Sequence, residues 1–109
     1  MEIIYKNNKV KEQCTALRRA KRDFSEKVAK KIMMRINFIT AAENLDSIIN
    51  NPVLHFHKLK GNLDGKFAID VDGRRTSYRL IVQFDETEVF ENAKYIEIIE
   101  VTEVSNHYE

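Results

Sequence analysis

The sequence predicts an α+β domain, in which an N-terminal strand and a helical hairpin pack on a small, mostly antiparallel sheet. The spacing of apolar residues carries this prediction, because they recur every three or four positions in residues 10–39 and every second position in residues 67–84. The length of 109 residues is typical of one domain, so we expect residues 1–109 to fold as a single unit. Apolar types make up 43% of the residues and charged types 32%, which is typical of a folded protein rather than a disordered one.

A short strand and a first helix are predicted at the N-terminus. The β-prone start of the chain predicts a strand over residues 2–6. Apolar residues then follow at spacings of four and three, which predicts a helix over about residues 8–20 (Val10, Cys14 and Leu17). Because Cys14 is the only cysteine and lies on the apolar face, we expect a buried thiol without a disulfide partner in the chain.

A longer second helix is predicted to complete the hairpin. Asp23 and Glu26 match a capping box, which predicts the start of this helix. Its apolar stripe repeats every four or three positions: Phe24, Val28, Ile32, Ile36 and Ile39. A basic stripe lies beside it, either as a solvated face or as a surface for nucleic acid or an acidic partner (Lys27, Lys31 and Arg35). One more helical turn is expected at residues 44–49, before Pro52.

Two strands joined by a tight turn are predicted next. Alternation over residues 67–72 predicts the first, and Asp72-Gly73 is a strong turn signal because glycine tolerates the positive φ of a tight hairpin. In the second, over residues 76–84, Arg79 lies opposite the core face formed by Tyr78, Leu80, Val82 and Phe84. Asp70 and Asp72 are expected on a solvated strand face, with a shared acid-base site as the weaker alternative.

The last strand is expected over residues 95–104, after an acidic connection at residues 85–94. Its alternation slips at Ile98 and Ile99, two apolar neighbours. This slip indicates either a β-bulge at that point or a central strand that is covered on both faces.

Charge is separated along the chain. Residues 1–36 carry a net charge of +7, residues 37–80 of +1 and residues 81–109 of −7. The basic segment suits contact with a polyanion, and the acidic segment equally suits neutralisation of the basic helices within the molecule. No apolar stretch approaches the ~18 residues of a membrane span, and the N-terminus lacks the apolar run of a signal peptide. We therefore expect a cytoplasmic protein without a membrane partner.

Motifs of several enzyme classes are missing. The sequence has no glycine-rich phosphate loop, no Cys-x-x-Cys pair and no His-Glu-x-x-His element, which argues against nucleotide hydrolases and zinc proteases. His55 and His57 lie on one side of an extended segment, which allows a two-histidine metal pair. No cysteine, histidine or acidic cluster beside them completes a ligand set, so we expect no metal and no cofactor.

Imidazole and cationic groups are concentrated in the predicted sheet and near the C-terminus. Metal-free cleavage of RNA needs a base for the ribose 2′-OH, cations for charge on the phosphate and an acid for the departing 5′ oxygen. Histidine, lysine and arginine supply all three roles, although the same residues also serve as ordinary surface charges. The members of this group are His57, Lys58, Lys60, Arg74, Arg75, Arg79 and His107.

Three segments of the chain resemble the HigB branch of the RelE superfamily, the toxins of bacterial type II toxin-antitoxin pairs. They are residues 54–61 (LHFHKLKG), 78–82 (YRLIV) and 104–108 (VSNHY). The order of the predicted elements matches as well. The resemblance implies a RelE-like, microbial ribonuclease-type fold and a ribosome-dependent mRNA endonuclease that inhibits translation without a metal. It also implies a helix-turn-helix antitoxin (HigA-like), whose complex with the toxin binds operator DNA.

The same resemblance implies which residues act. It assigns His107 as the general acid and Arg79 as the group that stabilises charge on the phosphate, with Lys60 or His57 assisting removal of the 2′-OH proton. Lys58, Arg74 and Arg75 are further residues that we expect to bind RNA. Because His57 and Lys60 lie three apart, they face opposite ways unless the strand ends at Lys60, which the following Gly61 permits.

Two other classes of function remain open. A nucleic-acid-binding or ribosome-binding regulator would block translation without cutting RNA, through the basic stripe of the second helix and the Arg74-Arg75 pair. An interaction domain would carry the same charges only as solvated groups. Replacing Arg79 or His107 separates these classes, because only an endonuclease then loses cleavage of the message.

Overall fold

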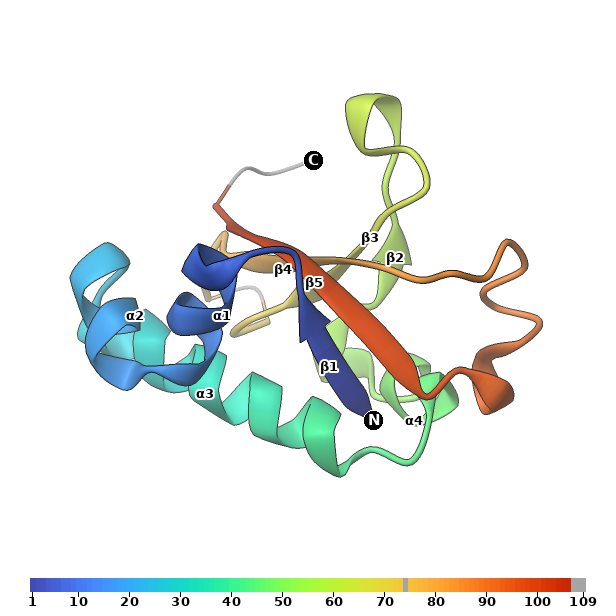
Figure 1. Cartoon of the computed structure of the whole chain (residues 1–109), viewed down its shortest axis with the longest axis horizontal. Helices are drawn as coiled ribbons and strands as arrows, with labels where there is room; N and C mark the ends of the chain where they lie inside the picture. The colour runs from blue at the N-terminus through green and yellow to red at the C-terminus, as the bar shows by residue number, and fades with distance from the viewer. Residues whose placement is uncertain (74, 107–109) are drawn as a thin grey trace.

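A computed structural model of the protein describes residues 1–73 and 75–106. In this part of the chain, helices cover one face of a five-stranded sheet, which confirms the predicted α+β class. The strands lie in the order β1 (Glu2–Tyr5), β5 (Ile98–Ser105), β4 (Arg79–Gln83), β3 (Phe67–Asp70) and β2 (His57–Lys58). Neighbouring strands are antiparallel, except that β1 runs parallel to β5. Figure 1 shows these two strands side by side, although they come from opposite ends of the chain.

The region predicted as one helix over residues 8–20 forms two, α1 (Asn8–Thr15) and α2 (Leu17–Asp23). Asn7 caps α1, because its side-chain oxygen accepts a hydrogen bond from the Val10 backbone N–H at 2.9 Å. Ala16 lies between the two helices in extended backbone, with φ −112° and ψ 106°. This break lets α2 turn back and pack against α3 (Glu26–Ala41), with Ala20 fully buried between them.

The predicted capping box at the start of α3 was wrong in register. Ser25, not Asp23, is the N-cap, since its hydroxyl oxygen accepts a hydrogen bond from the Val28 backbone N–H at 3.1 Å. Asp23 instead ends α2, where its carboxylate accepts hydrogen bonds from Gln13 Nε2 at 2.9 Å and Arg19 Nε at 2.7 Å. Tertiary partners therefore occupy the carboxylate that the local pattern assigns to the cap.

The predicted apolar stripe of α3 is confirmed. Ile32 and Ile39 are fully buried and Ile36 is 7% exposed, while Phe24 and Val28 pack against the same core with part of their surface exposed. α4 (Leu45–Ile49) confirms the helical turn expected at residues 44–49 and adds two side chains to this core. The strands contribute Phe67, Ile69, Leu80, Val82, Ile99 and Val101, and Val71 adds to the core directly after β3.

The β-bulge lies elsewhere than the doubled isoleucine indicates. Between β4 and β5, Ile81 pairs with Glu103 and Val82 pairs with Val101, so Thr102 is the extra residue. The Thr102 hydroxyl donates a hydrogen bond to the Ile81 carbonyl oxygen at 3.2 Å. At the predicted position, Ile98 is 52% exposed, so that part of the strand is covered on one face only. The strand itself begins at Ile98 rather than at residue 95, because the 3-10 turn η3 (Ala93–Tyr95) comes first.

The sheet face away from the helices is called the open face below. Strand pairing places on it His57, Ala68, Asp70, Arg79, Ile81, Glu103 and Ser105. A small apolar cluster of Leu59, Ala68 and Ile81 is buried on it, with Leu63 packed alongside. Leu63 belongs to the 3-10 turn η2 (Gly61–Leu63), which lies at the tip of a hairpin that projects from the body of the molecule (Figure 1).

Candidate active site on the open face

An ion pair between two neighbouring strands forms the centre of the candidate site. Asp70 of β3 lies opposite Arg79 of β4, and Arg79 Nε is 2.9 Å from Asp70 Oδ1. Both residues are buried, Asp70 with 2% and Arg79 with 8% of its surface exposed. The expectation that Asp70 lies on a solvated face was therefore wrong. Alternation correctly places Asp70 away from the core, but side chains from neighbouring segments cover it there.

The guanidinium of Arg79 is also held by the backbone around it. Its Nη1 donates hydrogen bonds to the carbonyl oxygens of Thr76 and Tyr78, each at 3.1 Å. Within the described residues, Asp70 Oδ1 accepts no aligned hydrogen bond, so charge rather than hydrogen-bond geometry joins it to Arg79. Thr76 belongs to the β3–β4 turn, and its carbonyl ties this turn to Arg79. The pair thus gives one arginine a defined position at the end of the sheet.

His55 also lies at this centre, although no motif in the sequence assigns it to the active site. Its Nδ1 lies 3.6 Å from Asp70 Oδ2, and its side chain is 57% exposed. Its backbone has φ 45° and ψ 51°, the left-handed region, where it caps the 3-10 turn η1 (Pro52–Leu54). A non-glycine residue seldom adopts this conformation, which requires support from its surroundings. The signal in the sequence was its spacing of two from His57, which the metal-pair hypothesis had used.

His57 is placed as a proton acceptor. Its ring stacks on that of His55, with centroids 4.4 Å apart and an interplanar angle of 24°. Its Nδ1 lies 2.8 Å from the His55 carbonyl oxygen. Because a carbonyl oxygen only accepts, Nδ1 carries the proton, and neutral His57 keeps its lone pair on Nε2. The half-buried ring can therefore take a proton at Nε2.

Lys60 is not brought beside Arg79. β2 ends at Lys58, and the next backbone hydrogen bond runs from Leu59 N–H to the Lys66 carbonyl oxygen, towards the hairpin tip. Lys60 follows as an exposed residue at the start of η2. At ~3.3 Å per residue, its backbone lies roughly 16 Å along the strand direction from the level of Asp70 and Arg79. Lys58 is exposed, and alternation places it on the strand face opposite His57.

Arg75 lies in the β3–β4 turn, next to the buried pair. Its side chain is exposed, and its backbone N–H donates to the Asp72 carbonyl oxygen at 3.0 Å. The neighbouring Arg74 and the predicted acid His107 lie outside the described residues. The structure therefore brings together the candidates His57 and Arg79, adds His55 and Asp70 to them, and places Arg75 in the adjoining turn.

The basic stripe of α3 is not merely solvated. Arg35 donates two hydrogen bonds to the Val71 carbonyl oxygen, from Nη2 at 2.6 Å and from Nε at 3.1 Å. Lys31 Nζ lies 3.7 Å from Asp72 Oδ1, whereas Lys27 is exposed. Burial lowers the pKa of Arg35, and the nearby Asp72 and Asp70 oppose that shift. Two of the three basic side chains thus attach α3 to the start of the β3–β4 turn.

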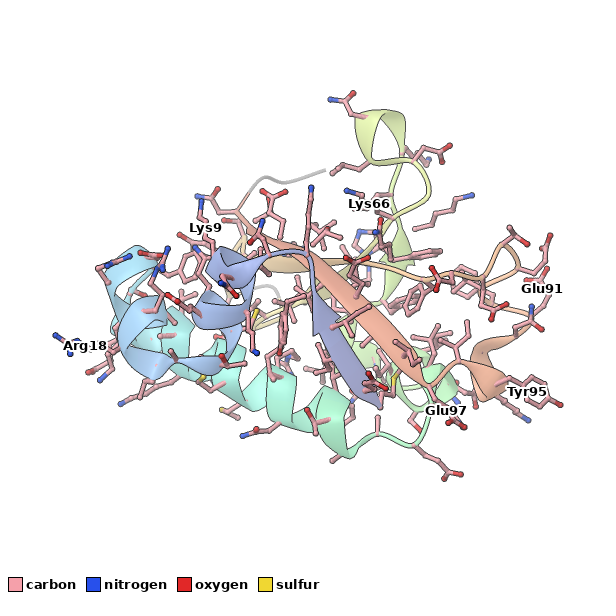
Figure 2. All side chains as sticks on the ribbon, viewed as in Figure 1. Lys9, Arg18, Lys66, Glu91, Tyr95 and Glu97 are labelled. Carbon is pink, nitrogen blue, oxygen red and sulfur yellow. The ribbon has the colours of Figure 1, made fainter. Side chains whose placement is uncertain are left out.

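A groove of about 600 Å³ lies at the other end of the sheet, away from the ion pair. Six carboxylates line it: Glu2, Glu43, Asp85, Glu86, Glu97 and Glu100. Figure 2 shows Tyr95 and Glu97 at this end, far from Lys66 on the projecting hairpin. Such a groove repels a polyanion. The groove is therefore a poor place for RNA, and the cationic end of the open face is the better candidate.

Other expectations concern residues outside this site. Cys14 is fully buried, as expected, and burial raises the pKa of its thiol to about 12, so the side chain is no nucleophile. Across residues 1–73 and 75–106, no group of three or more histidine, cysteine or acidic side chains is arranged to hold a metal ion. No helix in these ranges has the length and apolar character needed to cross a membrane.

Comparison with known proteins relates the chain to one family. The profile of a family described as RelE-like toxin of type II toxin-antitoxin system HigB matches residues 7–98. Among solved structures, the chain is similar to the YoeB-YefM complex from Staphylococcus aureus, with 21% identity and a TM-score of 0.48. That alignment covers 99% of this chain and 98% of the other chain. A search of curated proteins finds no match.

Proposed function

This chain belongs to the HigB-like family, the RelE-like toxins of type II toxin-antitoxin systems, and on that premise we propose that it is a ribosome-dependent mRNA endonuclease. The cluster of His57, His55, Asp70 and Arg79 at one end of the open face is the observation that carries the proposal. It supplies a proton acceptor and a cation within one small area. The strongly acidic groove lies elsewhere, so the field across the open face favours RNA at the cationic end.

The proposed reaction is a transesterification within the RNA. His57 Nε2 takes the proton from the ribose 2′-OH, and the 2′ oxygen attacks the adjacent phosphorus. Arg79 stabilises the negative charge that grows on the phosphate oxygens. The bond from phosphorus to the 5′ oxygen breaks, and His107 gives that oxygen its proton. The products are a 2′,3′-cyclic phosphate and a free 5′-OH, and no metal takes part.

The remaining basic residues are proposed to bind the flanking RNA. The position of Lys60 on the projecting hairpin favours contact with a neighbouring phosphate over a role at the scissile one. Lys58, Arg74 and Arg75 are assigned to further phosphates, which position the strand without reading its sequence. Of the two candidate bases, the proton on Nδ1 and the open Nε2 favour His57 over Lys60.

The proposed setting is the cytoplasm, where the toxin meets mRNA on the ribosome. Membership of a type II toxin family calls for a protein antitoxin. We assign to this role a helix-turn-helix, HigA-like protein encoded beside the toxin gene, and the complex of the two binds operator DNA. The sharply separated charges of the chain offer both a basic and an acidic surface for these partners.

The test adds purified protein to translating ribosomes and maps new 5′ ends on the message. We expect cleavage by the wild type and a loss of at least about 100-fold for His107→Ala and for His57→Gln, as is typical of general acids and bases. Arg18→Ala is the matched control, because Arg18 is an exposed cation on α2 (Figure 2) and its loss should leave cleavage unchanged. Intact message at doses that stop translation would refute the proposal and favour a non-catalytic regulator, whose inhibition fades with added salt.

A further inference from the structure

Asp70 is unusual among the acidic residues of this chain. Among the residues that the structure describes, it is the only buried carboxylate. It lies between two groups from different segments, with Arg79 Nε 2.9 Å from Oδ1 and His55 Nδ1 3.6 Å from Oδ2. Through these contacts one carboxylate joins β3, β4 and the segment that leads into β2.

Stability alone gives little reason for this arrangement. A buried ion pair pays a large desolvation cost, and well-packed apolar residues of similar volume usually stabilise a fold as well or better. The same two strands carry a buried apolar pair at the next open-face position, where Ala68 lies opposite Ile81. His55 adds strained backbone at the same place, which persists only where surrounding contacts hold it. A buried ion pair and a residue with strained backbone therefore lie at the same end of the sheet as His57.

We propose that Asp70 is a positioning residue of the RNA-cleaving site, which acts through Arg79 and through His55. On one side it holds the Arg79 guanidinium, whose Nη1 is also fixed by the Thr76 and Tyr78 carbonyls. On the other side its Oδ2 lies 3.6 Å from Nδ1 of His55, a contact that becomes an ion pair when His55 is protonated. The His55 carbonyl oxygen keeps the His57 proton on Nδ1, and the His55 ring stacks on that of His57. This inference rests on the proposed function, since it concerns how that site is kept in order.

Asp70 does not act as the base itself. Only 2% of its surface is exposed, less than the 8% of the neighbouring Arg79 and less than that of the half-buried His57. Its Oδ1 faces Arg79 Nε, and its Oδ2 faces His55 Nδ1. What Asp70 supplies is a fixed negative charge between two side chains that must keep their places when RNA arrives. Loss of that charge should therefore slow the chemical step more than it weakens binding.

The decisive variant is Asp70→Asn, which keeps the shape and removes the charge. We expect its single-turnover cleavage rate on ribosome-bound message to fall by about 10- to 100-fold, the effect of misplacing reacting groups by around 1 Å. The toxin concentration for half-maximal rate should change little. Asp85→Asn is the matched control, because Asp85 is an exposed carboxylate in the acidic groove. A wild-type rate for Asp70→Asn would overturn the proposal.

A double-variant cycle separates positioning from a merely structural role. Arg79→Lys keeps the charge but loses the planar fork, so it too should slow cleavage. If Asp70 acts through Arg79, the two losses overlap, and the double variant is little slower than Arg79→Lys alone. Losses that multiply would refute that arm. His55→Asn tests the other arm at an exposed side chain, since asparagine tolerates left-handed backbone. Its rate should fall several-fold, and an unchanged rate would refute the link through His55.

A measurement on the wild type decides the matter even where Asp70→Asn is unstable. NMR relaxation of the Arg79 Nε–Hε group should give an order parameter of about 0.85, as for rigid backbone. The same group of the exposed Arg18 (Figure 2) should give an order parameter below about 0.6. Equal mobility of the two arginines would overturn the proposal. Wild-type protein that cleaves no message would instead refute the proposed function, so the two failures are distinguishable.

Discussion

Arg35 offers the sharpest test of how the helices hold the turn beside the candidate site. The substitution Arg35→Met keeps most of the aliphatic stem and removes both N–H groups that the Val71 carbonyl accepts. A hydrogen bond from a charged donor contributes about 1.5–3 kcal/mol. Because the two donors share one acceptor, and because desolvation of Arg35 offsets part of the gain, we expect a loss of about 2 kcal/mol rather than twice that.

This loss is measurable by calorimetry and by urea unfolding. For a domain of about 100 residues, roughly 4–8 °C of melting temperature is lost per kcal/mol, so Arg35→Met should melt about 8–16 °C below the wild type. Lys27→Met is the matched control, because Lys27 lies on the same basic stripe but is exposed. Its free energy of unfolding should change by no more than about 0.5 kcal/mol. Equal effects of the two substitutions would show that the stripe is only a solvated face.

Two further predictions follow from groups with shifted pKa values. Hydrogen bonds from Gln13 and then from Arg19 hold the pKa of Asp23 well below its usual range. The stabilising effect of Asp23 is therefore complete above its unfolded-state pKa of about 4 and is lost as the pH falls through the lower folded-state value. In Asp23→Asn, the free energy of unfolding, measured by urea titration, should therefore fall less steeply with decreasing pH below about pH 4. An equally steep acid limb in the variant would contradict this reasoning. Burial raises the pKa of Cys14 to about 12, so we expect iodoacetamide to label native protein at pH 8 far more slowly than urea-unfolded protein, and equal labelling rates would contradict the burial.

Elements whose signals are local were well predicted. The stripe of α3, the short α4 and the alternating strands all follow from the spacing of apolar residues, because each element must bury one face. Errors arose where a local pattern had a competitor at a distance. Asp23 matches a cap, but Gln13 and Arg19 bind its carboxylate, so Ser25 caps α3 instead. The bulge at Thr102 shows in the sequence only as a spacing of three between Val101 and Val104, and its place in the sheet depends on pairing with Ile81 and Val82.

For the candidate site, the sequence predicts the residue types and the strand faces, but it does not predict which of these side chains come into contact. Alternation alone assigns Asp70 and Arg79 to the side of the sheet away from the core. Their pairing depends on strand register. The contact of Asp70 with His55, fifteen positions earlier, depends on a left-handed backbone at His55 that no local pattern indicates. An isolated carboxylate in a sequence is expected in water, because desolvation without a partner is costly. Folding supplied the partners, and so changed a predicted surface charge into the buried centre of the site.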